Sequence, residues 1–315
     1  MTEIVPAAPH EYDAALTLLF NQLPPNEQKA AIADVLTALR RGRIANHGVL
    51  AAKCEGRMVG SILYLMQHDR TAFVWPPAAA GARVAARDDA LLGEVIRRID
   101  AADAWLGQCL LEIDRHTERA ILERNGFRHL TDLRFLVRRL EHFPSSPPIT
   151  GPDGELLEAV TYEPGVNDAR FARLIERTYV KTRDCPELEG TRTGEQALVS
   201  HQMSGEFDPE RWRLYRWHGQ DAGVLLMNDH PEQSSWEVVY LGVAPDCRGH
   251  DLGRRMLYQG LVAARAAQRF SVLLAVDCRN EYAGKLYDEL GFVECDRRAV
   301  HLYLPSQPLA RAINQ

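Results

Sequence analysis

One long segment in the second half of the chain carries apolar residues at helical spacing. The positions that fall on one side of a helix between 252 and 268 are Leu252, Met256, Leu257, Gly260, Leu261 and Ala264. Apolar residues three or four apart form a stripe that a helix buries against its neighbours. The spacing therefore predicts a long helix with one buried face.

Shorter apolar runs on both sides of this helix predict strands and further helices. In the second half we expect strands at 156–162, 213–217, 223–228, 236–243 and 271–277, helices at 168–178, 194–203 and 281–290, and two final strands. In the first half we expect strands near 49–53 and 58–66 and a helix near 89–105. Both halves are therefore predicted to have a mixed α/β fold.

Two segments far apart in the sequence resemble each other. Residues 110–127 read LLEIDRHTERAILERNGF, and residues 273–292 read LLAVDCRNEYAGKLYDELGF. Each combines an apolar strand, a polar turn, a helix and a Gly-Phe pair, whose glycine suits the positive φ that follows a helix. A further β-like run follows each segment, at 133–140 and at 299–304. We infer a duplicated domain.

A linker is expected between the two copies. Residues 141–155, EHFPSSPPITGPDGE, combine Pro, Ser and Gly with few apolar residues, which is typical of a linker. We therefore expect a first domain at 1–140, a second at 156–305 and a tail at 306–315.

Composition and charge exclude several classes of protein and partner. With 46% hydrophobic and 25% charged residues, the chain is globular rather than disordered or fibrous. A net charge of −6 without a basic stripe argues against nucleic acid and against an anionic membrane as partners. Six scattered cysteines and an N-terminus without a signal-peptide pattern favour a cytoplasmic protein without a metal site. We expect a monomer or a homodimer.

The segment 236–257, WEVVYLGVAPDCRGHDLGRRML, carries the strongest functional signal. An apolar strand is followed by a short turn with Arg248 and Gly249, and a helix begins near Leu252. At such a helix start the free N–H groups and the helix dipole attract anions, and Arg254 adds positive charge. The turn therefore predicts a site for a diphosphate group.

Other phosphate-binding motifs fit this turn less well. A dinucleotide fingerprint needs G-x-G-x-x-G, whereas the glycines here are Gly249 and Gly253, and the G-K-[ST] of a P-loop is absent. An ordinary strand–helix connection with solvated arginines is the structural alternative.

The same segment is similar to the acyl-CoA signature of the GNAT superfamily of N-acetyltransferases, V-x-P-x-x-[RQ]-x-x-G-x-[GA]. The matching residues are Val243, Pro245, Arg248 and Gly253, whereas Asp251 stands at the first glycine of the signature. An acidic side chain there opposes a bound diphosphate unless it faces solvent or pairs with an arginine.

Downstream, residues 280–292 are similar to the family element N-x-x-A-x-x-x-Y-x-x-x-G-F. The resemblance implies acetyl-CoA as co-substrate and a mixed sheet whose two central parallel strands splay apart. It also implies that Leu241 and Val243 pair with the pantetheine arm of the coenzyme. The other residues implied to bind the coenzyme are Arg248, Gly249, His250, Asp251, Leu252, Gly253, Arg254, Asn280 and Lys285.

Acetyl transfer to an amine needs a base and an acid. A lysine-like ammonium has a pKa of about 10.4, so its deprotonation at pH 7 costs about 4–5 kcal/mol. Glu237 stands where some family members carry a glutamate base; alternatively, it is an exposed carboxylate at a strand edge. Tyr287 matches the family tyrosine near the thioester sulfur and is the candidate acid; alternatively, it is a core tyrosine.

The first half retains less of the family pattern. It keeps Gly126 and Phe127, but Leu122 stands where the second half has Tyr287, and PPAAAGARVAA follows its strand at 73–75. We expect a degenerate GNAT-like domain that binds no CoA and walls off the acceptor site. This layout is similar to that of mycothiol synthase-type tandem acetyltransferases.

The favoured function is an acetyl-CoA-dependent N-acetyltransferase that acts on a primary amine of a small molecule. The alternatives are a protein N-terminal or lysine acetyltransferase and a non-catalytic acyl-CoA-binding or scaffold protein. The loop at 183–195 is rich in carboxylates, which hints at a cationic amine, although a solvated loop explains it equally well.

Overall fold

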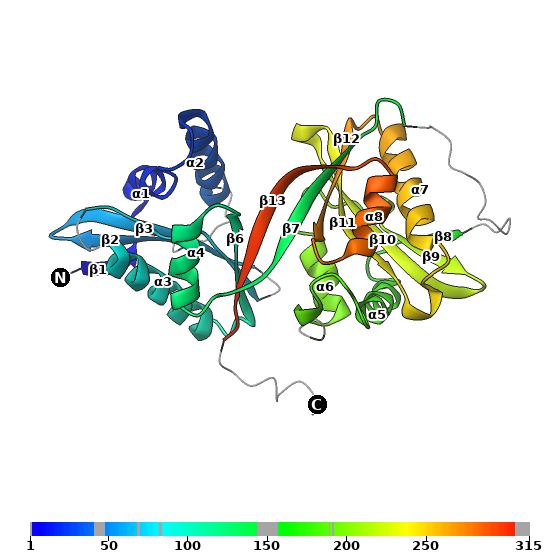
Figure 1. Ribbon diagram of the computed structural model, residues 1–315, viewed down its shortest axis with the longest axis horizontal. Coiled ribbons are helices and arrows are strands. Elements are labelled where there is room, and N and C mark those ends of the chain that lie inside the picture. Colours follow the sequence, from blue (N-terminus) through cyan, green and yellow to red (C-terminus); the bar gives the residue numbers. More distant parts are fainter. Residues whose placement is uncertain are drawn as a thin grey trace. The chain divides into compact units, whose positions relative to one another are not determined.

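The chain folds into two compact units (Figure 1). The computed structural model describes residues 2–40, 48–67, 70–81, 84–143, 157–188, 190 and 192–305. The first unit holds the residues up to Leu130 together with those from Ala299 onward, and the second unit holds Thr131–Arg298.

This division differs from the domain boundaries expected from the sequence. The run at 133–140 lies in the second unit, where β7 (Arg128–Arg139) pairs with β12 (Ser271–Asp277), and the run at 299–304 lies in the first. The residues of a strand do not specify which neighbouring strand it pairs with. The prediction therefore placed each of these two runs in the half of the sequence that contains it. Most of the expected linker at 141–155 and the tail at 306–315 lie outside the described residues.

The first unit is a sheet in the order β1–β2–β3–β4–β6 followed by the end of β13, with β5 paired to β3. Its elements are β1 (Thr2–Pro6), α1 (Tyr12–Leu19), α2 (Pro25–Arg40), β2 (Val49–Cys54), β3 (Arg57–Met66), β4 (Thr71–Val74), β5 (Ala78–Ala79), α3 (Val84–Ala101), β6 (Leu106–Glu112) and α4 (His116–Arg124). The helix expected near 89–105 is α3, which begins and ends earlier than predicted.

Helices cover both faces of this first sheet. Val49 of β2 lies in one apolar core with Leu16 of α1 and Leu39 of α2, whereas the next residue, Leu50, lies in another core with Leu91 of α3. Successive side chains of a strand point to opposite faces. The sheet is therefore buried on both sides, which explains the continuous apolar character of its inner strands.

The second unit is a mixed sheet in the order β13–β7–β12–β11–β10–β9–β8. Its further elements are β8 (Glu158–Thr161), α5 (Asp168–Tyr179), α6 (Gly194–His201), β9 (Arg213–Trp217), β10 (Gln220–His230), β11 (Ser235–Val243), α7 (Leu252–Ala266), α8 (Glu281–Glu289) and β13 (Val293–Tyr303). The expected elements of the second half are present, except that the two final strands form one, β13. The polar residues at 294–298 interrupt the apolar pattern but not the strand.

The two central strands of the second unit separate part-way along their length. β11 and β12 pair in parallel from Ser235 with Ser271 to Val238 with Leu274, and the described chain shows no pairing between them beyond that point. At the same place β11 has a bulge against β10, and bulges bend a strand away from its neighbour. The predicted splay of the central strands is confirmed.

Helix α7 packs on one face of this sheet and α5 on the other (Figure 1). The buried residues of α7 are those of the predicted stripe. The helix approaches the sheet closely at Gly260, where a Cβ atom would lie 2.7 Å from Met227 Sδ and 2.8 Å from Leu225 Cδ2. On the opposite face, a Cβ at Gly242 would lie 2.7 Å from Thr178 Oγ1 of α5.

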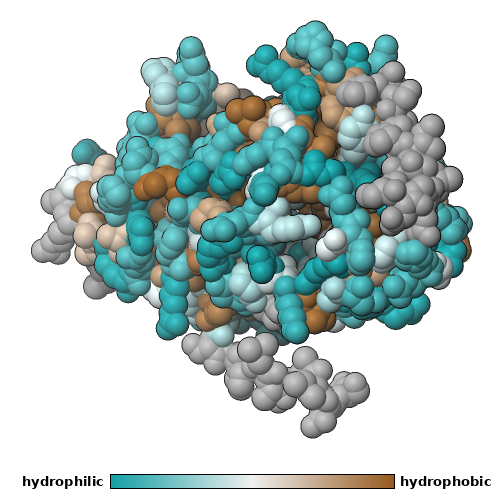
Figure 2. Space-filling view, turned by 45° about the vertical axis from the view of Figure 1, so that its right-hand side comes forward, coloured by the Kyte–Doolittle hydropathy of each residue, from teal (hydrophilic) through white to brown (hydrophobic). Residues whose placement is uncertain are grey.

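Hydrophilic residues cover most of the surface seen in Figure 2, and apolar residues there form small separate groups. Among the described residues, no helix combines the length and the apolar character that crossing a membrane requires.

Gly260→Ala is expected to lower the free energy of unfolding by about 1 kcal/mol, because overpacking a filled core costs more than the gain in helix propensity. The matched control is Gly93→Ala in α3, where an added Cβ would meet nothing within 4 Å. That control is expected to raise stability by about 0.5–1 kcal/mol. Urea denaturation measures both, and an equal gain in the two variants would contradict the close packing of α7.

Candidate active site

The backbone amides at the start of α7 form an open row of hydrogen-bond donors. Those of residues 249–254 donate to no other described residue, whereas the Arg255 amide donates to the Asp251 carbonyl at 3.1 Å. The first N–H groups of a helix have no partner within the helix, and the helix dipole makes this end positive. The turn therefore has the anion-binding geometry that its sequence predicts.

Asp251, the departure from the family signature, has a local explanation. Its φ is +57°, a left-handed backbone conformation that favours glycine and that Asp tolerates better than most residues. Its carboxylate accepts a hydrogen bond from Arg254 Nε at 3.1 Å, and Arg254 also pairs with Glu289. The turn thus keeps the backbone shape that a glycine would give, and the extra negative charge is paired.

The Arg248 guanidinium binds backbone carbonyls. It donates to the carbonyl oxygens of Val243 at 3.1 Å, Thr178 at 2.9 Å, Val180 at 3.0 Å and Lys181 at 3.1 Å. Three of these carbonyls lie at the end of α5, where a helix leaves acceptors unpaired. Arg248 therefore ties the turn to α5, and its contact with a phosphate stays a prediction.

The splayed end of β11 presents a free edge. Leu241 pairs with Leu225 and Val243 with Gly223 on the β10 side, while on the β12 side the pairing ends at Val238. An unpaired strand edge can accept an extended ligand as an additional strand. This edge leads directly to the row of amides.

The remaining expected coenzyme ligands have varied surroundings. The ring of His250 packs against that of Trp217 with centroids 4.5 Å apart. Asn280 caps α8, because its Oδ1 accepts a hydrogen bond from the Ala283 amide at 3.2 Å. Lys285 is exposed on α8. Their coenzyme contacts stay predictions.

Glu237, the expected base, is a half-buried residue of β11. Its Oε2 accepts a hydrogen bond from Ser204 Oγ at 2.6 Å and lies 2.8 Å from His230 Nε2. The alternative of an exposed carboxylate at a strand edge does not describe this environment, because β11 is paired with β10 and with β12 at Glu237.

Tyr287, the expected acid, is buried in α8, with its ring 5.7 Å from that of Phe292. Burial, with a smaller contribution from the charge of Asp184, raises the pKa of Tyr287 above its ordinary value. A tyrosine hydroxyl is protonated at neutral pH even at its ordinary pKa, as a proton donor must be.

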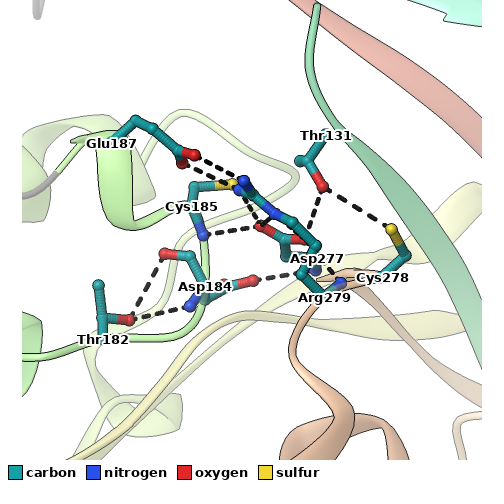
Figure 3. A network of polar contacts seen from close by, with 8 residues as sticks. All are labelled: Thr131, Thr182, Asp184, Cys185, Glu187, Asp277, Cys278 and Arg279. Carbon is teal, nitrogen blue, oxygen red and sulfur yellow. Dashed lines mark hydrogen bonds and ion pairs between the residues drawn. The ribbon is translucent and has the colours of Figure 1, made fainter.

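Asp277, at the end of β12, lies at the centre of a polar network (Figure 3). Its carboxylate accepts hydrogen bonds from Arg279 Nη2 at 2.7 Å, from Thr131 Oγ1 at 2.6 Å and from the Cys185 amide at 3.0 Å. Burial by itself raises the pKa of Asp277, but these hydrogen bonds outweigh burial and lower the pKa to about 2.

This network fixes residues 184–187, in the segment between α5 and α6. Arg279 also binds Glu187, at 2.5 and 2.9 Å, and the carboxylate of Asp184 accepts from the Asp277 amide at 2.9 Å. Two of the carboxylates that hinted at a cationic acceptor are therefore engaged within the protein, and Glu189 lies outside the described residues. Glu195, the fourth carboxylate of the loop, is exposed.

Asp184, Cys185 and Asp277 place possible metal ligand atoms within 4.8 Å of one another. Arg279, however, occupies both oxygens of Asp277. Burial also raises the pKa of the Cys185 thiol, which disfavours the thiolate that a metal requires. The network therefore anchors the segment after α5 to the end of β12.

The sequence did not single out Ser204, His230 or Arg279. His230 reaches Glu237 only because β10 and β11 form a hairpin in a particular register, and Ser204 lies in an irregular segment. The register of β10 against β11 could be inferred from the length of their connection. The position of Ser204 depends on tertiary packing, and no local sequence pattern marks this residue.

Comparison with known proteins agrees with this geometry. The sequence model of the Acetyltransferase (GNAT) family matches residues 178–292. The mycothiol acetyltransferase of Streptomyces coelicolor is 30% identical over 295 residues, which are 90% of this chain and 89% of that protein. The matches to three further mycothiol acetyltransferases span only 55%, 60% and 52% of their own lengths. The chain belongs to the GNAT family of acetyltransferases.

Two solved structures share the fold. A GCN5-related N-acetyltransferase from Sphaerobacter thermophilus has a TM-score of 0.68 at 19% identity, with 96% of this chain and 95% of that chain covered. A tandem GNAT protein from the clavulanic acid biosynthesis pathway has a TM-score of 0.55 at 17% identity, with 98% and 100% covered. The predicted architecture of two tandem GNAT-like domains is confirmed.

Asp277→Asn is expected to lower the free energy of unfolding at pH 7 by roughly 2–3 kcal/mol, since each pKa unit is worth about 1.4 kcal/mol. Because the pKa of Asp277 is lowered to about 2, its contribution is complete above pH 4 and is lost as the pH falls toward 2. The stability difference between parent and variant should narrow over that window.

Denaturation at several pH values measures this difference. The matched control is Asp288→Asn, an exposed carboxylate whose contact with Arg134 is 3.4 Å long. A difference that stays constant from pH 5 to 2 would show that the ionised form of Asp277 is not what the network stabilises.

Proposed function

We propose that the protein transfers an acetyl group from acetyl-CoA to a primary amine of a small molecule, and that the second unit carries the reaction. The observation that carries this proposal is the open row of amides at 249–254 beside the unpaired edge of β11. Family membership supports the acetyl donor. The relatives named mycothiol acetyltransferase favour a small-molecule acceptor over a protein.

The coenzyme would be held mainly by main-chain groups. The amides at the start of α7 suit the diphosphate, because several N–H donors and the helix dipole converge there. The free edge of β11 at Leu241 and Val243 suits the amide groups of the pantetheine arm, which can pair as a strand does. Asp251 opposes the diphosphate charge, and its pairing with Arg254 reduces that cost.

In the proposed reaction, Glu237 removes a proton from the ammonium form of the acceptor. The neutral nitrogen attacks the thioester carbonyl and a C–N bond forms. The nitrogen then releases its second proton to solvent, and the C–S bond breaks. Tyr287 donates its proton to the departing sulfur, and the products are the N-acetyl amine and the CoA thiol. The proton taken up by Glu237 returns to solvent, and Tyr287 regains one from solvent.

The first unit is proposed to bind no coenzyme. β4 is followed by two prolines and the two-residue strand β5, and α3 carries Asp88 one turn after its start. Asp88 is buried, and burial raises its pKa to about 6. A buried carboxyl near a helix start is unfavourable for a diphosphate.

Calorimetry with acetyl-CoA followed by a thiol-release assay tests the proposal. The acceptors would be a panel of small amines, including mycothiol without its acetyl group, and a lysine peptide. We expect binding, and thiol release with a small amine but not with the peptide. Binding without release from any acceptor would favour an acyl-CoA-binding protein, and release only with the peptide would favour a protein acetyltransferase.

Glu237→Gln is expected to lower kcat about a hundredfold at pH 7 with little change in acetyl-CoA affinity, because general bases contribute about 10²–10⁴. The loss should be largest below pH 8, where the free amine is scarce. Steady-state kinetics across pH and calorimetry measure both quantities, with Glu232→Gln as the control. Equal rates of variant and parent over this range would reject the base role.

Tyr287→Phe is expected to slow turnover tenfold or more, which is the low end of what an acid contributes. The variant removes only the hydroxyl, so the packing against Phe292 is retained. Tyr258→Phe in α7 is the control. A Tyr287 variant as fast as the parent would assign the proton to water.

Asp251→Asn is expected to tighten acetyl-CoA binding roughly twofold to fivefold, because a charge at a helix terminus is worth about 0.3–1 kcal/mol. Asparagine also tolerates the positive φ of this position. Calorimetry measures the affinity, and Asp114→Asn in the first unit controls for net charge. Unchanged or weaker binding would place the diphosphate elsewhere.

A further inference from the structure

Two side chains outside every predicted motif contact Glu237. Ser204 Oγ donates to Glu237 Oε2 at 2.6 Å, and His230 Nε2 lies 2.8 Å from the same oxygen. We propose that Ser204 and His230 are positioning residues for acetyl transfer, which hold Glu237 so that its other oxygen meets the acceptor amine. This inference rests on Glu237 as the base of the proposed function.

Both contacts use one oxygen of the carboxylate. Glu237 Oε1 has no hydrogen bond to any described residue, and the side chain is 29% exposed. An ionised carboxylate only accepts hydrogen bonds, so both partners donate to Oε2. Oε1 is then the oxygen left to take a proton from the ammonium group.

The strand register places these groups on one face of the sheet. Glu237 pairs with Asn228 across the β10–β11 hairpin, and His230 follows two residues after Asn228 on the same strand. Residues two apart share a face, so all three side chains lie on the same side. His230 and Glu237 are therefore diagonal neighbours, within reach of long side chains.

Ser204 is held in place by the buried amide of Asn228. Its Nδ2 donates to the carbonyls of His201 at 2.6 Å and Ser204 at 2.5 Å, and its Oδ1 accepts from Trp212 Nε1 at 2.9 Å. Asn228 has no exposed surface, and both ends of its amide are satisfied. The segment after α6 is thus fixed at the residue that binds Glu237.

Gly205 allows the segment after α6 to pack closely against the side chain of His230. Its φ is +62°, and a Cβ there would lie 2.9 Å from His230 Nε2 and 2.6 Å from the Asp229 carbonyl oxygen. The next residue, Glu206, exchanges two backbone hydrogen bonds with Asp229, at 2.7 and 3.1 Å. The imidazole is therefore confined between this segment and Glu237.

A confined carboxylate matters because proton transfer depends on geometry. A free glutamate samples several rotamers, and a misplacement of about 1 Å costs up to a hundredfold in rate. Two donors on Oε2 restrict Glu237 to one orientation before the acceptor arrives. Loss of either donor should lower kcat and leave the coenzyme site, which lies farther along β11, unaffected.

A double-mutant cycle with Glu237→Gln tests the proposal. Ser204→Ala and His230→Leu are each expected to lower kcat about tenfold, with the Kd for acetyl-CoA unchanged. His230→Gln should retain most of the activity, because its amide N–H can replace the imidazole donor. In the Glu237→Gln background, Ser204→Ala and His230→Leu should cause no further loss. Ser200→Ala on α6 is the control for the serine.

The outcomes separate this inference from the proposed function. Parent-like rates of Ser204→Ala and His230→Leu, with Glu237→Gln slow, would overturn the positioning role and leave the base in place. If Ser204→Ala and His230→Leu lower kcat by the same factor in the parent and in the Glu237→Gln background, the positioning role is also overturned. A fast Glu237→Gln variant would remove both base and positioning roles. If His230→Leu does not fold, Ser204→Ala and His230→Gln carry the same test.

Discussion

The parting of β11 and β12 is the constraint on which the rest of the second unit depends. Their parallel pairing ends at Val238 and Leu274, although both strands continue. Unpaired strand edges inside a sheet are costly unless something else satisfies them. The bulge that redirects β11 therefore leaves an edge with which an extended ligand can pair, and α7 begins with its own free amides just beyond it. These donors and acceptors belong to the main chain, so they persist when a side chain departs from the family signature, as Asp251 does.

Several contacts keep the two sides of this gap in place. Arg248 joins the turn to the end of α5, and the Asp277 network joins the loop after α5 to the end of β12. In the first contact an arginine donates to main-chain carbonyls, and in the second an aspartate accepts from a main-chain amide. These main-chain groups have no partner in a helix or strand. Asp277 is buried, whereas its partner Arg279 and the Glu187 that Arg279 binds are exposed. The loop beside the splayed strands is therefore fixed before any ligand arrives.

Local patterns in the sequence predicted the features that local physics determines. The stripe of α7 and the motif turn follow from spacing within a few residues, and both are present as expected. The run at 133–140 lies in the second unit and the run at 299–304 lies in the first, which was not predicted. The reason is that strand pairing depends on residues far apart in the sequence. The same reason explains why the contacts of Arg248 with the end of α5 were not predicted: those carbonyls are about seventy residues away along the chain. Glu237 could be named from its spacing, but its partners Ser204 and His230 required the register of β10 and β11.

The most direct measurement of the central claim is a crystal structure with bound acetyl-CoA. The account predicts that the diphosphate oxygens accept hydrogen bonds from the amides at 249–254 and that the pantetheine arm lies along Leu241–Val243, with its sulfur between the separated strands. Coenzyme bound elsewhere on the chain, with these amides turned to solvent, would contradict it.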